Sequence, residues 1–307
     1  MTKMDNKKGV VIFGHPRSGT TLLRRLLNSH SAIAAPPETH LFSACARFLD
    51  QDLTAEGIDM GVLSGLYYAG FEDDYVLDQL REFAFKFLNQ FVEKQGKNRW
   101  AEKTAYDIFK LNNIVKLCED QVFYLGIIRH PLDVAVSSKE FCETSGFYPT
   151  EMHKYIQKYS QPIEAFIHSW VDTTNSLIEL GKSQPENCLI CRYEDLVNEP
   201  EEVLGEILSA IGEKKEPNMI SKALTDPGVL GFSDNKSYQS SQIYRNSIEK
   251  WQSLPSPQID RLASVVNPLL EICGYDPIKS GETYNIDELR RRYINILMIH
   301  ASKNKGN

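Results

Sequence analysis

The first clear hydrophobic segment of the chain is short, rich in β-branched residues and followed at once by a turn. Residues 9–14 read GVVIFG, a pattern typical of a strand that is buried on both faces of a parallel sheet. A turn follows over His15 to Gly19, and apolar residues then recur at helical spacing over 20–29 (TTLLRRLLNS). The pattern predicts a strand, a tight turn and a helix in direct succession.

Two further units repeat this alternation. Residues 121–129 (QVFYLGIIR) form an apolar run after a helical segment that ends near 114–117, and Pro131 is well placed in the first turn of the next helix. Residues 187–193 predict a third strand, with a helix near 201–211. Strands that alternate with helices predict an α/β fold with a central, mainly parallel sheet flanked by helices in three layers.

The segments between these units predict elaborations around the sheet. We expect residues 42–99 to hold no strand and, like 145–182, to be mainly helical. Within Leu77–Val92, apolar residues fall on one side of a helix, which we interpret as core packing; they are Leu80, Phe83, Phe87, Leu88 and Phe91. Residues 225–246 are rich in Gly, Ser and Asn and predict a lid-like loop. We expect one domain over 1–307.

Composition and charge exclude several classes of protein. Asp and Glu number 41 against 34 Lys and Arg, a net charge of −7, which argues against nucleic-acid binding. No apolar run approaches the roughly 20 residues that span a bilayer. The start, MTKMDNKKG, lacks the apolar stretch of a signal peptide, so we expect a cytoplasmic protein with no membrane contact. Cys188 and Cys191 lie three apart in a predicted strand, which favours buried or half-buried thiols over zinc ligands.

The turn after the first strand carries a phosphate-binding pattern. Gly14 and Gly19 have the spacing of the P-loop GxxxxGK[ST], in which backbone N–H groups and a helix N-terminus hold a phosphate. A nucleotide kinase has Lys after the second glycine, whereas this chain has Thr20, and its cation is Arg17, inside the turn. The turn therefore predicts a P-loop-like phosphate site that is poorly equipped for Mg²⁺-dependent phosphoryl transfer.

Two motifs together resemble the sulfotransferases that use 3′-phosphoadenosine 5′-phosphosulfate (PAPS). Residues 16–21 (PRSGTT) resemble the loop that binds the 5′-phosphosulfate, and residues 129–137 (RHPLDVAVS) resemble the motif that binds the 3′-phosphate. The chemistry fits this resemblance, because Arg129 ends a strand and Ser137 lies two turns into the next helix. Both can reach one phosphate, the Arg through charge-assisted hydrogen bonds.

Further segments extend the resemblance over residues 9–275. Residues 100–104 (WAEKT), 192–196 (RYEDL) and 247–251 (SIEKW) are similar to family segments, the last to one that closes over the nucleotide. The resemblance implies metal-free transfer of a sulfuryl group from PAPS to a hydroxyl or amine, leaving PAP. We expect a small-molecule acceptor, with specialised metabolites among the candidates. The alternatives are a P-loop nucleoside or small-molecule kinase and a non-catalytic PAP-binding protein.

The resemblance also assigns roles to single residues. Glu38 lies 21 residues after Arg17, as does the base of tyrosylprotein sulfotransferases, and a PPExHL run like that of 36–41 occurs in cyanobacterial polyketide sulfotransferases. Glu38 is the expected base and His40 the second candidate, while Arg17 assists the leaving phosphate and Lys103 the sulfuryl oxygens. The expected nucleotide contacts are Arg17, Ser18, Gly19, Thr20, Thr21, Arg129, Ser137, Tyr193, Arg245, Ser247, Lys250 and Trp251. Residues 39–100, 140–180 and 225–246 are expected to select the acceptor.

Overall fold

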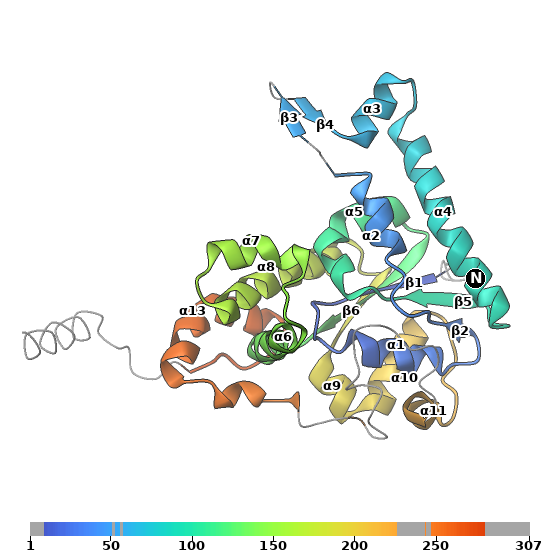
Figure 1. Ribbon diagram of the computed structural model, residues 1–307. Helices are drawn as coiled ribbons and strands as arrows, with labels where there is room; N and C mark the ends of the chain where they lie inside the picture. The colour runs from blue at the N-terminus through green and yellow to red at the C-terminus, as the bar shows by residue number, and fades with distance from the viewer. Residues whose placement is uncertain (1–8, 51–52, 56–57, 226–242, 244–246, 280–307) are drawn as a thin grey trace, which may run out of the picture. The chain divides into compact units, whose positions relative to one another are not determined.

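The strand predicted over 9–14 lies at the centre of a five-stranded sheet (Figure 1). The strand order is β2-β5-β1-β6-β7, and every neighbouring pair is parallel. The strands are β1 (Gly9–Phe13), β2 (Ile33–Ala34), β5 (Arg99–Glu102), β6 (Val122–Ile128) and β7 (Cys188–Arg192). The predicted α/β fold with a parallel central sheet is confirmed.

The computed structural model describes residues 9–50, 53–55, 58–225, 243 and 247–279. The chain divides into two compact units, Met1–Trp251 and Gln252–Asn307. In the second unit, helix α13 (Ser256–Ile272) buries Leu262, Val266 and Leu270, and a short 3₁₀ helix, η5 (Lys250–Ser253), spans the junction. The sheet and all the predicted site residues described below lie in the first unit.

Side chains that alternate along β1 and β6 fill two hydrophobic layers. Val10 and Ile12 belong to a core cluster on one side of the sheet, which includes residues of the four helices that cover this face. These are α1 (Thr20–Asn28), α9 (Tyr193–Asn198), α10 (Pro200–Ala210) and α11 (Met219–Thr225). On the other face the Tyr124 hydroxyl donates a hydrogen bond to the carbonyl of Glu119, at 2.8 Å. Helices α5 (Leu111–Cys118) and α8 (Pro162–Ser183) lie on that face, so the fold has three layers (Figure 1).

The remaining helices surround this framework. They are α2 (Leu41–Arg47), α3 (Val62–Tyr68), α4 (Asp73–Lys94), η2 (Ala105–Lys110), α6 (Pro131–Ser145), η3 (Thr150–Met152) and α7 (His153–Lys158). The predicted helical character of 145–182 is thus confirmed. The predicted lid-like loop over 225–246 lies, apart from Thr225 and Ile243, outside the described residues. None of the helices that the structure describes is long and apolar enough to cross a bilayer.

The expectation that 42–99 contains no strand is wrong. Strands β3 (Leu53–Ala55) and β4 (Ile58–Met60) pair in an antiparallel hairpin. Each has three residues, so neither is long enough to reveal an alternating pattern. The sequence also does not predict strand β5, which begins at Arg99. Two of its four residues, Arg99 and Glu102, are charged, so no apolar run marks the strand.

The predicted core stripe of α4 is also partly wrong. Leu88 is buried, but Phe83 and Phe87 are 52% and 51% exposed. Arg81 sets the helix orientation, because its buried guanidinium donates to the carbonyl of Leu117 (2.6 Å) and pairs with Glu119 (3.0 Å). The buried residues of α4 therefore include only one aromatic side chain; they are Val76, Leu77, Arg81, Ala84, Phe85, Leu88 and Val92.

The CxxC pair lies on edge strand β7, as the sequence predicts. Cys188 and Cys191 are half-buried free thiols, and residues three apart in a strand face opposite sides of the sheet. Burial raises the pKa of both thiols to about 12. Both thiols therefore remain protonated at neutral pH, as is usual for cysteines that pack in the interior and are not reactive.

Candidate active site

The phosphate turn joins the carboxyl end of β1 to the first residue of α1. The Ser18 N–H donates to the His15 carbonyl at 3.0 Å, and both Arg17 (φ +73°) and Gly19 (φ +94°) take left-handed conformations. Helix α1 begins at Thr20, and Gly19 provides no side-chain cap for its first N–H groups. The uncapped donors and the helix dipole together give the turn a positive potential that favours an anion.

Both glycines of the turn are required by close packing. A Cβ on Gly14 would lie 2.8 Å from the carbonyl oxygen of Ile127 in β6, and a Cβ on Gly19 would lie 2.3 Å from the Tyr193 ring. Real Cβ atoms do not approach other atoms so closely. The glycines therefore let the turn pack directly against β6 and α9.

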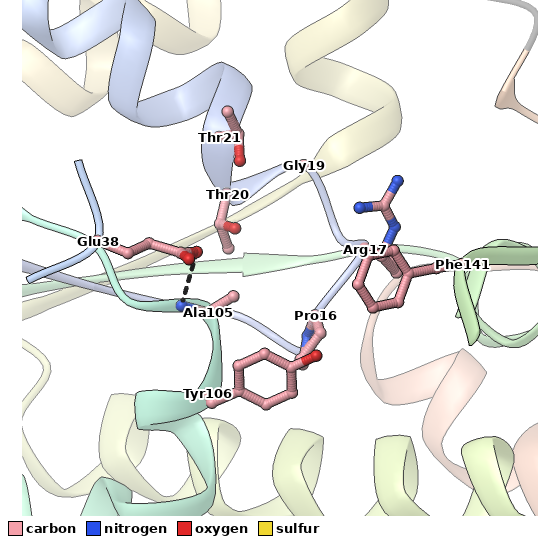
Figure 2. A pocket seen from close by; sticks show the side chains of 9 residues that line it. All are labelled: Pro16, Arg17, Gly19, Thr20, Thr21, Glu38, Ala105, Tyr106 and Phe141. Atoms are coloured by element: carbon pink, nitrogen blue, oxygen red, sulfur yellow. Dashed lines mark hydrogen bonds between the residues drawn. The ribbon is translucent and has the colours of Figure 1, made fainter. Parts of the chain in front are cut away.

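A pocket opens beside this turn (Figure 2). It is lined by Pro16, Arg17, Gly19, Thr20, Thr21, Glu38, Ala105, Tyr106 and Phe141. In Figure 2, Glu38 and Arg17 lie on opposite sides of the pocket, with Thr20 between them. The Arg17 Nε donates to the Ser137 hydroxyl at 3.2 Å, and its guanidinium carbon lies 5.5 Å from the centre of the Phe141 ring. The pocket thus brings a cation, a carboxylate and two hydroxyls to a helix N-terminus.

Glu38 and Lys103 meet at this pocket. The Lys103 Nζ lies 2.6 Å from the Glu38 Oε1 and 3.3 Å from the Thr21 hydroxyl. Their side chains are only 11% and 3% exposed, so water weakens the pair little. The Ala105 N–H is a further donor to Glu38 at 3.4 Å, drawn as a dashed line in Figure 2.

A buried carboxyl group holds the loop of Glu38 against the end of β5. The Glu102 Oε1 accepts hydrogen bonds from the hydroxyls of Thr39 and Thr104, both at 2.8 Å. Burial raises the pKa of Glu102, and it raises the pKa of the nearby Asp107 strongly. Since Thr39 follows Glu38 and Glu102 precedes Lys103, these bonds help to hold the pair together.

The second phosphate motif converges on the first. Arg129, at the end of β6, donates through Nη1 to the Arg17 carbonyl at 2.8 Å and through Nη2 to the Ser247 carbonyl. Its guanidinium lies 4.7 Å from the centre of the Tyr193 ring, and the Tyr193 hydroxyl is 2.7 Å from that of Ser247. The Trp170 indole N–H donates to the Arg129 carbonyl at 3.1 Å. Residues from four distant segments thereby meet at Arg129.

Residues 247–251, here called the strap, lie along the start of α6. The Trp251 ring stacks on His130 with centroids 5.1 Å apart. The Asp133 carboxylate accepts the N–H groups of Glu249 (2.8 Å) and Trp251 (3.1 Å). The Lys250 Nζ lies 4.0 Å from the Glu140 carboxylate.

The predicted residues that line the pocket are Arg17, Gly19, Thr20, Thr21 and Glu38, and three more, Lys103, Ser137 and Arg129, contact members of this set directly. His40 and Ser18 do not line it. His40 is exposed at the beginning of α2, where its backbone N–H donates to the Thr104 hydroxyl. Ser18 is fully buried, and its hydroxyl has no partner among the described residues. Arg245 lies outside the described residues.

The sequence analysis missed the aromatic walls of the pocket and the residues that support it. Tyr106 lies three residues after Lys103, and Phe141 lies one helical turn after Ser137. Helical spacing from Ser137 was the signal that could have found Phe141, and the place of Tyr106 two residues after the WAEKT segment was the signal that could have found Tyr106. Glu102 and Asp133 stood within the quoted motifs, but their roles depend on bonds to distant segments that no local pattern encodes.

The parallel sheet and its glycine turn at a helix N-terminus define a P-loop-like α/β protein. Within that class, the model of the sulfotransferase family matches residues 9–217, and the chain belongs to this family. The matched range includes both phosphate motifs, Glu38 and Lys103, whereas the strap lies beyond it.

Individual relatives agree with this assignment. Protein-tyrosine sulfotransferase 1 of Danio rerio is 23% identical over 289 residues, which cover 91% of this chain and 76% of the relative. The sulfotransferase domain of the curacin biosynthetic pathway superposes with a TM-score of 0.61 at 20% identity, over 89% of this chain and 99% of the domain. Mouse sulfotransferase SULT7A1, solved with PAP, gives a TM-score of 0.51 at 14% identity, over 88% and 89%. These structures share the fold.

Proposed function

We propose that the protein transfers a sulfuryl group from PAPS to a hydroxyl or amine of a small-molecule acceptor and releases PAP. The observation that carries the proposal is that Glu38, paired with Lys103, lines the same pocket as the phosphate turn. A base therefore stands beside the place where the reacting group of the donor would bind. Membership of the sulfotransferase family and the PAP bound to the mouse relative support the choice of donor.

Each of the two phosphate motifs would bind a different phosphate group of the nucleotide. The 5′-phosphosulfate would bind at the turn, to the first N–H groups of α1, the hydroxyls of Thr20 and Thr21, and Arg17. The 3′-phosphate would bind to Arg129 and Ser137. The buried Nε of Arg129 has no acceptor among the described residues, which an anionic ligand would supply. Ser18, Gly19, Tyr193, Arg245 and the strap residues Ser247, Lys250 and Trp251 complete the proposed contacts.

The chemical step is an in-line displacement at sulfur. The acceptor oxygen or nitrogen forms a bond to sulfur while the bond between sulfur and the bridging phosphate oxygen breaks. Glu38 takes the acceptor's proton. Arg17 stabilises the charge that develops on the leaving phosphate, and Lys103 stabilises the sulfuryl oxygens. Because these cations already face the anionic groups, we propose that turnover requires no divalent metal.

The acceptor is the finer part of the proposal. Pro16, Tyr106 and Phe141 give the pocket apolar walls, which suit an acceptor with an apolar body and a nucleophilic group. Relatives in the family are named both for protein tyrosine and for a biosynthetic pathway. We propose a small molecule, and a peptide acceptor is the outcome that would correct this choice.

Binding and transfer test the proposal separately. Calorimetry with PAP in EDTA should show binding, and adenosine 5′-phosphosulfate, which lacks the 3′-phosphate, should bind far more weakly. PAPS is then offered with panels of small-molecule alcohols, phenols and amines and of tyrosyl peptides, and sulfonated products are detected by mass. A strict Mg²⁺ requirement with turnover of ATP would favour a kinase. PAP binding without transfer to any acceptor would favour a non-catalytic PAP-binding protein.

A further inference from the structure

Asp133 stands out because both of its carboxylate oxygens accept hydrogen bonds from residues outside its own helix. It lies in the first turn of α6 and is 1% exposed. Its Oδ2 accepts the Glu249 N–H at 2.8 Å, and its Oδ1 accepts the Trp251 N–H at 3.1 Å. An acidic residue at this helical position often serves only the helix dipole. Here it also binds two backbone donors of a segment more than 110 residues away.

The strap that Asp133 holds carries contacts to the nucleotide site at its other end. The Ser247 carbonyl accepts a hydrogen bond from Arg129, and the Ser247 hydroxyl meets that of Tyr193. Between the two ends, Glu249 has φ +61°, a left-handed conformation that costs a non-glycine residue energy. The Asp133 bond to the Glu249 N–H fixes the backbone at this strained residue.

We propose that Asp133 is a positioning residue for the nucleotide, because it latches the strap over Arg129 and so maintains the binding-competent arrangement. This inference rests on the proposed function only for the identity of the ligand. A ligand that requires the docked strap binds only to molecules in which the strap is docked. Its apparent affinity therefore falls in proportion to the fraction of such molecules. Loss of the latch should therefore weaken binding of the 3′-phosphate without altering the turn that binds the 5′-group.

The latch can be tested first without any ligand, through tryptophan fluorescence. The protein has three tryptophans; Trp100 and Trp170 are 0% exposed, whereas Trp251 on the strap is half-buried. Acrylamide quenching thus reports mainly on Trp251. Asp133→Asn keeps the shape, but its amide presents a donor to one of the two strap N–H groups, so quenching should increase. Asp74→Asn is the matched control, because Asp74 is an exposed acid in the first turn of α4.

PAP binding provides the second readout. Asp133→Asn should raise the Kd for PAP about 10-fold to 100-fold, the loss expected when one hydrogen bond to a charged group is removed. The increase should come mainly from faster dissociation. Binding of adenosine 5′-phosphosulfate should change much less, a selectivity that general destabilisation would not produce. If Asp133→Asn does not fold, Asp133→Glu tests the same latch, because it keeps the charge but displaces the two carboxylate oxygens from the strap N–H groups, and PAP dissociation is again the measurement.

The outcomes separate the inference from the function on which it rests. If the unaltered protein fails to bind PAP, the proposed function is wrong, and quenching still decides whether Asp133 holds the strap. If the unaltered protein binds PAP and Asp133→Asn matches it in quenching and Kd, the latch is wrong. Equal losses for PAP and adenosine 5′-phosphosulfate would also overturn it, because they would indicate damage to the whole site.

Discussion

Lys103 and Glu38 lie 65 residues apart in the chain, yet the Lys103 Nζ is 2.6 Å from the Glu38 Oε1. The lysine comes from the end of β5 and the glutamate from the loop that follows β2, its neighbour in the sheet. Each compensates the charge of the other, and both side chains are nearly buried. The carboxylate that lines the pocket is therefore held in position by a cation.

Glu38→Gln removes the charge of the proposed base but keeps its shape. We expect kcat to fall about 10²-fold to 10⁴-fold, the usual contribution of a positioned acid or base, with little change in PAP affinity. His40→Asn should do less harm, because His40 lies exposed outside the pocket. Steady-state kinetics with an acceptor from the screen measures both variants. Near-normal kcat in Glu38→Gln, together with loss of activity in His40→Asn, would transfer the role to His40.

Lys103→Met should destabilise the protein, because it removes the cation that lies 2.6 Å from the Glu38 carboxylate, a side chain that is only 11% exposed. We expect a loss of about 3 kcal/mol in the free energy of unfolding, measured by urea denaturation. The double variant Glu38→Leu with Lys103→Met should recover much of it. Lys139→Met is the control, since its pair with Glu143 is exposed and should contribute less than about 1 kcal/mol. Equal effects at the two lysines would contradict a buried pair.

Gly19→Ala should damage stability and nucleotide binding together. The new Cβ would meet the Tyr193 ring, and φ +94° is unfavourable for alanine. We expect a loss of about 2–4 kcal/mol, the sum of overpacking and left-handed strain. Gly96→Ala has a positive φ (+64°) but open space around the Cβ, so only the strain of about 1 kcal/mol should remain. Thermal melts of both variants would contradict the packing argument if their losses were equal.

Arg129→Ala should weaken PAP binding far more than it lowers kcat at saturating PAPS. The 3′-phosphate is remote from sulfur, so its contacts are equally strong in the ground state and the transition state. Loss of about 1.5–3 kcal/mol per charge-assisted bond is expected. Calorimetry gives the PAP affinity and initial rates give kcat. Normal affinity with a collapsed kcat would place Arg129 in the chemistry instead.

The contribution of His15 to the free energy of unfolding should fall as the pH drops below about 6.5. Burial lowers the pKa of His15 to about 4, whereas the unfolded residue titrates near 6.5. Between these values the unfolded chain binds a proton that the folded chain excludes, so acid favours unfolding, by roughly 2 kcal/mol at pH 5. Buried Glu102 and Asp107, with raised pKa values, act in the opposite direction.

The variant His15→Gln isolates this contribution. At pH 7 it should be less stable than the unaltered protein, because its contacts with the Pro16 carbonyl and the Ser169 hydroxyl are disturbed. As the pH falls to 5, that deficit should shrink, since only the unaltered protein carries the penalty of the buried imidazole. Denaturation at several pH values measures the difference. A constant deficit would mean that His15 titrates normally in the folded state.

Sequence patterns predict those parts of the fold that are long or chemically distinctive. Strands β1 and β6 are continuous apolar runs, and the turn that joins β1 to α1 carries glycines, an arginine and hydroxyls in a fixed order. Strands β2, β3 and β4 have two or three residues each, and their pairing depends on partners far along the chain. The orientation of α4 follows from Arg81 contacting α5, which no property of α4 alone specifies.

The same distinction applies to the site. The spacing from Arg17 to Glu38 identified a candidate base. It could not identify Lys103 as the partner of Glu38, because the two side chains meet only when β2 lies beside β5. The exposed position of His40 could not be predicted either, since it follows from the left-handed backbone (φ +55°) at the start of α2. The motifs indicate which chemical groups the site contains, whereas the order of the strands in the sheet determines which of these groups come into contact.

The bond from Arg129 to the Arg17 carbonyl, which closes a loop of 112 residues, bears on how the protein folds. Parallel strands cannot pair through a hairpin, and contacts of high sequence separation must offset a large loss of chain entropy before they stabilise anything. Arg129 can reach the turn only after β1 and β6 are side by side. During synthesis the turn emerges long before this arginine, so a ligand held by both could stabilise only chains in which the two strands have already paired.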